Sequence, residues 1–71
     1  MKTVKRILLS LNLNPCTHIV IRRHTERGIA MLGGSFKVSE IIYRFGDKLV
    51  ENSFITSDGL FIMYVKDNEN E

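Results

Sequence analysis

The sequence is poor in residues that cross-link or interrupt a chain: it has one cysteine, one proline and no tryptophan among 71 residues. A single cysteine excludes an intramolecular disulfide and a thiolate cluster for zinc. No apolar run approaches the ~18 residues that cross a bilayer. Ser10 and Asn12 interrupt the apolar segment that follows the basic N-terminus, so we expect neither a membrane span nor a secretory signal, and a cytoplasmic location.

The length allows one hydrophobic core. We therefore expect a single small domain over residues 1–71, in which residues 66–71 form a frayed acidic tail. With 44% hydrophobic and 25% charged residues, the composition is that of an ordinary globular domain. Domains of this size often gain stability from disulfides, metals or self-association. Because the first two are not indicated here, a homodimer is an open alternative.

Two segments have the i, i+3, i+4, i+7 apolar spacing of a helix with one buried face. The apolar positions are Val4, Ile7, Leu8 and Leu11 in the first segment and Val38, Ile41, Ile42 and Phe45 in the second. Thr3 can cap the first helix, and Pro15 predicts that it ends by Leu13. Gly46 follows the second helix, where a left-handed cap is expected.

Four segments read as strands because they are rich in β-branched or alternating apolar residues. They cover residues 18–22, 29–32, 49–56 and 60–65. Residues 24–28 and 57–59 are polar, each contains a glycine, and they predict the connections within two hairpins. Gly33, Gly34 and Ser35 are expected to end the second strand and bend the chain toward the second helix.

The predicted elements follow the order α-β-β-α-β-β, so both halves of the chain consist of a helix and a hairpin. Residue identities do not match between the halves, and we interpret this as a repeated architecture without a sequence repeat. One antiparallel four-stranded sheet with both helices on one face is the simplest α+β arrangement that buries both helical stripes.

This order of elements resembles a group of very small α+β proteins encoded on phages and integrated mobile elements of low-GC bacteria. The features that carry the resemblance are the helix over residues 4–11, the strand over residues 19–21, the turn at Gly28, the helix after Gly33 and Gly34, and the closing run Asp58, Gly59, Leu60, Phe61 and Ile62. They cover most of the chain but include no motif specific to a chemical activity. The resemblance implies a mobile-element source and no activity that could be transferred.

Positive charge is concentrated in the first half of the chain. Residues 1–36 carry six Lys or Arg and one Glu, a net charge of +5, whereas residues 37–71 carry four Lys or Arg and seven Asp or Glu, a net charge of −3. This asymmetry can attract a polyanion or an acidic protein surface, or it can serve solubility alone. The candidate binding residues are Lys5, Arg6, Arg22, Arg23, His24, Arg27 and Tyr43.

Most aromatic residues fall on the predicted buried stripes. Phe36, Phe45, Phe54, Phe61 and Tyr64 are therefore expected in the core. Tyr43 lies off the stripe of its helix and is a candidate contact residue or a partly buried residue at the helix edge. Uncovered apolar residues, for which Val20, Met31 and Met63 are candidates, would favour dimerisation or partner binding.

Catalytic and metal-binding patterns are weak in this sequence. Cys16 and His18 lie two residues apart but lack an orienting third group, and His18 and His24 have no nearby Cys or acidic pair that would complete a metal site. Gly33 and Gly34 precede a helix without matching a phosphate-binding motif. We therefore expect no enzyme, no metal and no cofactor.

The function that these patterns favour is a non-enzymatic binding module. Its partner would be a protein, and the resemblance suggests a phage or mobile-element inhibitor that blocks a host defence complex. The alternative is a weak, sequence-nonspecific nucleic-acid-binding protein that uses the basic hairpin around Arg22, Arg23 and Arg27. No exposed aromatic residue is expected among these basic residues, which weakens the alternative because single-strand binders stack bases on such rings.

Overall fold

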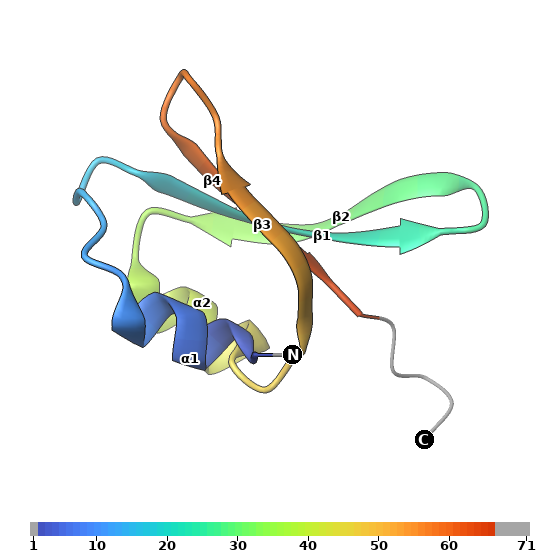
Figure 1. Ribbon diagram of the computed structural model, residues 1–71, viewed down its shortest axis with the longest axis horizontal. Coiled ribbons are helices and arrows are strands. Elements are labelled where there is room, and N and C mark those ends of the chain that lie inside the picture. The colour runs from blue at the N-terminus through green and yellow to red at the C-terminus, as the bar shows by residue number, and fades with distance from the viewer. Residues whose placement is uncertain (1, 67–71) are drawn as a thin grey trace.

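The computed structural model describes residues 2–66, which form two helices and a four-stranded sheet (Figure 1). In chain order the elements are α1 (Val4–Ser10), β1 (His18–Thr25), β2 (Gly28–Ser35), α2 (Val38–Phe45), β3 (Val50–Ile55) and β4 (Leu60–Val65). Both helices lie on the same side of the sheet (Figure 1). The α+β class and the order of the elements are confirmed. Neither helix in the described part of the chain is long and apolar enough to span a membrane.

The sheet is mixed, so the prediction of one antiparallel sheet is wrong. The strand order is β2-β1-β4-β3, and the two central strands, β1 and β4, are parallel while both hairpins are antiparallel. The helix α2 explains this difference, because it connects β2 to β3 and returns the chain along the sheet. The strands β2 and β3 therefore run in one direction, and their hairpin partners β1 and β4 both run in the other.

Burial explains which strands are central. β4 has five consecutive buried residues and β1 has three, whereas β2 contains three glycines and β3 has a polar segment from Glu51 to Ser53. The most apolar strands gain most from neighbours on both sides. The expected repeat of a helix and a hairpin is present in both halves, but the first strand is central in one hairpin and the second strand in the other.

The helices cover the main core. Its buried members are Val4, Leu8, Ile19, Ile21, Ile41, Phe45, Val50, Phe61, Met63 and Val65. Alternation along β1 and β4 sends the odd-numbered residues of both strands to this side, which we call the helix face. Met63 is fully buried there, so the prediction that it is uncovered is wrong.

The helix α1 is shorter than expected. The Thr3 hydroxyl accepts a hydrogen bond from the Arg6 backbone N–H at 3.2 Å and caps its start. The helix ends at Ser10, within the predicted limit of Leu13, but Leu11 is extended, so the last residue of the predicted apolar stripe lies outside the helix. The side chain of Asn14 then accepts a hydrogen bond from the Cys16 N–H at 2.8 Å and shapes the turn around Pro15.

Gly46 does not form the left-handed cap that its position predicts. Its φ and ψ are −56° and −32°, which is right-handed helical geometry. A Cβ at this position would clash with the Ile42 carbonyl oxygen, and the Gly46 carbonyl accepts a hydrogen bond from the Lys5 N–H at 3.1 Å. Glycine is therefore needed here for a close approach of backbones, which also connects the end of α2 to the start of α1.

The glycine pair Gly33 and Gly34 lies inside β2 and does not end the strand, contrary to the prediction. A Cβ on Gly33 would lie 3.0 Å from the Phe45 ring, and a Cβ on Gly34 would lie 2.9 Å from the Ile19 carbonyl oxygen and 3.1 Å from the His18 ring. Each glycine therefore makes room for a ring, on opposite faces of the sheet. A bulge at Leu32 separates this part of β2 from its first half.

The C-terminal tail is described only at its first residue. Lys66 is exposed, and its backbone N–H donates to the Leu49 carbonyl oxygen at 2.8 Å. The rest of the predicted frayed acidic tail, residues 67–71, lies outside the described residues.

Candidate functional site: the open face of the sheet

The face of the sheet opposite the helices forms a second, distinct surface, which we call the open face. The strand register places on it His18, Val20, Arg22 and His24 of β1; Leu60, Ile62 and Tyr64 of β4; Ile29, Met31 and Gly34 of β2; and Asn52 and Phe54 of β3. Phe36 joins them because its ring stacks on His18. Residues from all four strands therefore contribute to one surface.

The centre of the open face is a small second core. Val20, Ile62 and Tyr64 are 4%, 4% and 7% exposed, and Leu60 packs against them. No helix lies over these residues, so neighbouring side chains on the same face shield them from solvent (Figure 1). A buried floor of this kind holds the side chains above it in fixed positions.

Two ring stacks fix the polar side chains on this surface. His18 stacks on Phe36 with ring centroids 4.6 Å apart, and His24 stacks on Tyr64 at 4.5 Å. Phe54 approaches Tyr64 from the neighbouring strand, with centroids 6.1 Å apart. Tyr64 is buried, and the rings of His24 and Phe54 lie against it from the two neighbouring strands to form an aromatic row; among the described residues, no ring contact connects this row to the His18–Phe36 stack.

Large apolar side chains remain exposed on the open face. Ile29, Met31, Phe36 and Phe54 are 55%, 64%, 60% and 43% exposed. The prediction that Phe36 and Phe54 belong to the core is therefore wrong, whereas the predicted exposure of Met31 is confirmed. The predicted open-face residue Val20 does face this side, but it is buried in the floor.

Sequence reasoning missed the aromatic row, although a signal was available. Phe54 is paired with Ile62, and Tyr64 lies two residues further along β4 on the same face. Because β4 is apolar on both faces, its alternation does not identify the face that the helices cover. The available signal is on β3, where Asn52 and Ser53, the polar neighbours of Phe54, indicate a strand with little cover on either face.

Arg22 is the only permanently charged residue among the open-face residues named above. Its Nη1 lies 3.5 Å from the Tyr64 hydroxyl oxygen, to which it donates a long hydrogen bond, and its side chain is half-buried. The guanidinium has five donor N–H groups, so this contact leaves donors for another molecule. With His18 and His24 on the same strand face, the polar groups of β1 form a row beside the apolar side chains of β2.

The structure divides the predicted basic cluster. Lys5 and Arg6 are exposed residues of α1, which lies on the helix side, whereas Arg27 is in the turn between β1 and β2 (Figure 1). Arg23 alternates with Arg22 and points to the helix face, where a shallow pocket at the hairpin end is lined by Arg23 and Arg27. Of the predicted basic residues, only Arg22 and His24 share the open face.

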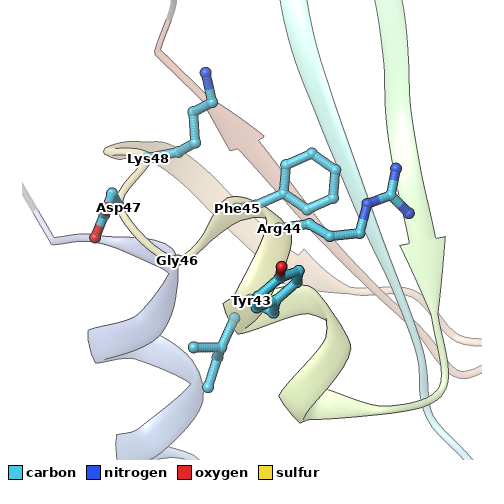
Figure 2. Close-up of a pocket in the computed structure, with 7 residues that line it drawn as sticks. Tyr43, Arg44, Phe45, Gly46, Asp47 and Lys48 are labelled. Atoms are coloured by element: carbon cyan, nitrogen blue, oxygen red, sulfur yellow. The ribbon is translucent and has the colours of Figure 1, made fainter.

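Tyr43 belongs to a separate surface at the C-terminal end of α2. Its side chain is 90% exposed, which favours the interpretation as a contact residue over that as a partly buried edge residue. Figure 2 shows it beside a shallow pocket of about 190 Å³, lined by residues 42–48. Arg44 extends over the Phe45 ring, with its guanidinium carbon 5.1 Å from the ring centroid. The pocket is on the helix side, so Tyr43 does not extend the open face.

The chemically reactive candidates are not brought together. Cys16 is exposed in the loop before β1, and His18 is stacked on Phe36. Within residues 2–66, no group of three or more His, Cys, Asp or Glu side chains is arranged to hold a metal ion.

The open face thus exposes several large apolar side chains that do not contribute to the core. Comparison with protein-family models, with curated proteins and with solved structures finds no match to the chain.

Proposed function

We propose that this chain is a non-enzymatic binding module that holds a protein partner on the open face of its sheet. The observation that carries the proposal is the exposure of four large apolar side chains, Ile29, Met31, Phe36 and Phe54, over a floor that is already buried. Large apolar groups exposed on one face of a small domain indicate an interaction surface; here they lie on both outer strands, with the floor of β1 and β4 between them. Aromatic residues, methionine and arginine are also the types enriched in protein interfaces.

Rigidity supports this role. The Phe36 ring is stacked on His18, and Phe54 packs beside Tyr64, so both exposed rings are held before a partner arrives. A side chain that is already ordered loses less conformational entropy on binding, and this favours affinity. Phe36 and Phe54 are therefore the two anchor residues of the proposal.

The charged and titratable residues of the open face indicate which kind of partner surface would fit it. The residues that the register places on the open face include Arg22 and two histidines and no carboxylate. A matching partner surface has an apolar centre bordered by Asp or Glu, which can receive the free donors of Arg22. If the resemblance to small phage proteins reflects ancestry, the partner would be a host protein, for example a component of a defence complex, that is blocked by occupation of its surface.

Nucleic acid fits this surface less well. Lys5 and Arg6 lie on the helix side and Arg23 points to the helix face, so few cations border the exposed rings. Phosphate contacts supply most of the affinity of nonspecific nucleic-acid binding. The aromatic row does provide rings on which bases could stack, so nucleic acid is the second outcome that an experiment has to distinguish.

Two adjacent residues of β3 provide a matched test. Phe54 is on the open face, whereas Ile55 is paired with Phe61 and points to the other side; they are 43% and 59% exposed. The wild type, Phe54→Arg and Ile55→Arg should each be tagged and used to capture partners from a bacterial lysate treated with nuclease. Captured proteins should be identified by mass spectrometry, and the affinity for any such protein should be measured at several salt concentrations.

The proposal expects a near-stoichiometric protein that wild type and Ile55→Arg retain and Phe54→Arg loses by about tenfold or more. Affinity should fall only modestly with salt, because the centre of the contact is apolar. Equal loss in both variants would move the contact away from the open face. Retention only of nuclease-sensitive material, with a steep log-linear salt dependence, would replace the protein partner by nucleic acid.

A further inference from the structure

The outer edge of β2 is an unprotected strand edge. β2 is the end strand of the sheet, and its eight residues, Gly28–Ser35, include no charged residue and no proline. Among the described residues, no backbone hydrogen bond outside the pairing with β1 involves this strand. Edge strands in natural proteins usually carry lysine, proline or a covering segment, because free backbone N–H and C=O groups recruit another strand.

The opposite edge of the sheet has these protections. The Val50 N–H of β3 donates to the Lys2 carbonyl oxygen at 2.8 Å, and Thr3 forms an isolated bridge with Leu49. β3 also has an irregular register between Val50 and Asn52, with the charged Glu51 between them. The start of β3 is therefore covered, and a charge and an irregular register follow it, whereas the edge of β2 has none of these features.

We propose that the edge of β2 pairs with β2 of a second copy of this chain, in an antiparallel and two-fold symmetric contact. Such a contact is isologous, so each residue of β2 must suit the residue that it meets on the other copy. With the two strands overlapped end to end, Gly28 meets Ser35, Ile29 meets Gly34, and Ala30 meets Gly33. The second copy is the occupant because this strand is complementary to itself.

In this register, the paired residues of the two copies point to the same face of the sheet and have the same type of hydrogen-bonding position. Ile29 and Gly34 are paired with His24 and Val20 of β1, which lie four residues apart, so both occupy the same type of ladder position and the open face. Ala30 and Gly33 share the other type of position and the helix face, because the bulge at Leu32 shifts the alternation between the two halves of β2. These three pairings therefore combine matching backbone directions, and the central pair, Met31 with Leu32, lies at the bulge.

Side-chain sizes also match. Ile29 is 55% exposed, whereas Gly34 has no side chain beyond the backbone on the same face. Because the His18 ring already lies beside Gly34, the Ile29 side chain of one copy would pack against Gly34 and this ring of the other copy, and the symmetric contact does this twice. Burial of an exposed isoleucine in this way is favourable by the apolar area removed from water.

Charges at the ends of β2 complement each other in the same arrangement. Arg27 comes just before Gly28, and at the other end the Ser35 hydroxyl donates to Oε1 of the exposed Glu40 at 3.1 Å. The antiparallel overlap brings Arg27 of one copy to the end that carries Glu40 of the other. Each end carries both signs, with Glu26 beside Arg27 and Lys37 beside Ser35, and this register brings opposite charges together as Arg27 with Glu40 and Glu26 with Lys37.

The result is a continuous eight-stranded sheet in which the two open faces form one surface. Self-association is one of the ways in which small domains gain stability. The contact goes beyond the proposed partner binding and does not depend on it. Main-chain hydrogen bonds along one strand and little other contact give a weak dimer, with a dissociation constant on the order of 10 to 100 µM.

The test is sedimentation velocity of the full chain from about 10 µM to about 1 mM, a range that spans this constant. Ala30→Lys puts a lysine near its symmetric copy on the helix-face side of the edge, and Ser53→Lys makes the same charge change on β3. Both positions are half-exposed, so the variants are matched. Circular dichroism should establish that both fold.

We expect wild type and Ser53→Lys to dimerise with concentration, and Ala30→Lys to dimerise about tenfold more weakly or not at all. A second readout needs no variant: on dilution of wild type, the amide resonances of residues 28–35 should shift more than those of β3. A monomer at about 1 mM, an open-ended oligomer, equal loss in both lysine variants, or dilution shifts concentrated on β3 would each overturn the proposal. Loss of the dimer in Phe54→Arg would indicate association through the open face instead.

Discussion

The two methionines of the sheet allow the assignment of faces to be tested with one substitution at two positions. Met63 is 0% exposed in the core under the helices, whereas Met31 is 64% exposed on the open face. A buried Met→Ala substitution costs about 2 to 5 kcal/mol through lost transfer free energy and the cavity that remains. A 71-residue domain has a free energy of unfolding of about 4 to 11 kcal/mol. Met63→Ala should therefore remove a large part of the stability.

For the central estimate of about 3 kcal/mol, the melting temperature should fall by about 12 to 24 °C in a domain of this size. Met31→Ala should change the free energy of unfolding by less than about 0.5 kcal/mol, because its side chain loses little contact. Urea and thermal unfolding followed by circular dichroism measure both values, at low protein concentration so that self-association does not contribute. Similar costs at the two positions, or a cost below about 1 kcal/mol for Met63→Ala, would show that the faces of the sheet are assigned incorrectly.

Two further substitutions test local contacts. Gly34→Ala should destabilise the fold by about 1 to 2 kcal/mol, because the added Cβ meets the Ile19 carbonyl oxygen at 2.9 Å and the His18 ring at 3.1 Å; urea unfolding measures this, and a neutral or stabilising effect would contradict the close approach. Thr3→Ala should cost about 1 kcal/mol by removing the acceptor of the Arg6 N–H, and Thr3→Ser should restore most of it. If the serine variant is as unstable as the alanine variant, the hydroxyl does not cap α1.

Local sequence patterns predicted the elements well because each element is determined by residues close in sequence. The helical stripes that end in Leu11 and Phe45 located both helices, although α1 stops at Ser10, where the chain turns toward Asn14 before Pro15. The strands followed from β-branched and alternating residues. Only the ends shifted, and they depend on contacts that a local pattern does not contain.

The sheet arrangement could not be predicted in the same way. Whether β1 pairs with β3 or with β4 depends on how the connection through α2 places the second hairpin. A fully antiparallel sheet would satisfy the same local patterns. The glycine pair in β2 was misread for a similar reason, since the rings of Phe45 and His18 that need the space come from other elements. Residue type alone does not distinguish a glycine at a bend from a glycine beneath a ring.

The candidate site could likewise be predicted where a local pattern decides the position of a residue, and not where contacts between distant elements decide it. Exposure of Tyr43 and Met31 could be predicted from their positions relative to one stripe or strand. The separation of Arg22 from Arg23 also follows from alternation, because successive residues of a strand point to opposite faces. The aromatic row of His24, Tyr64 and Phe54 depends on the pairing of distant strands, so its contacts appeared only with the structure.

The parallel pairing of β1 with β4 has a consequence for how the chain acquires its fold. Arg22 and Tyr64 are in contact although 42 residues separate them, so the centre of the sheet closes only when the last strand arrives. Contacts at such separation slow folding, because the entropy of closing a long loop is lost before any contact forms. During synthesis, the hairpin of β1 and β2 would be complete before α2 and β4, with two free edges and only α1 available to cover Ile19 and Ile21. The earliest hairpin is therefore the one most exposed to mispairing until Leu60–Val65 joins it.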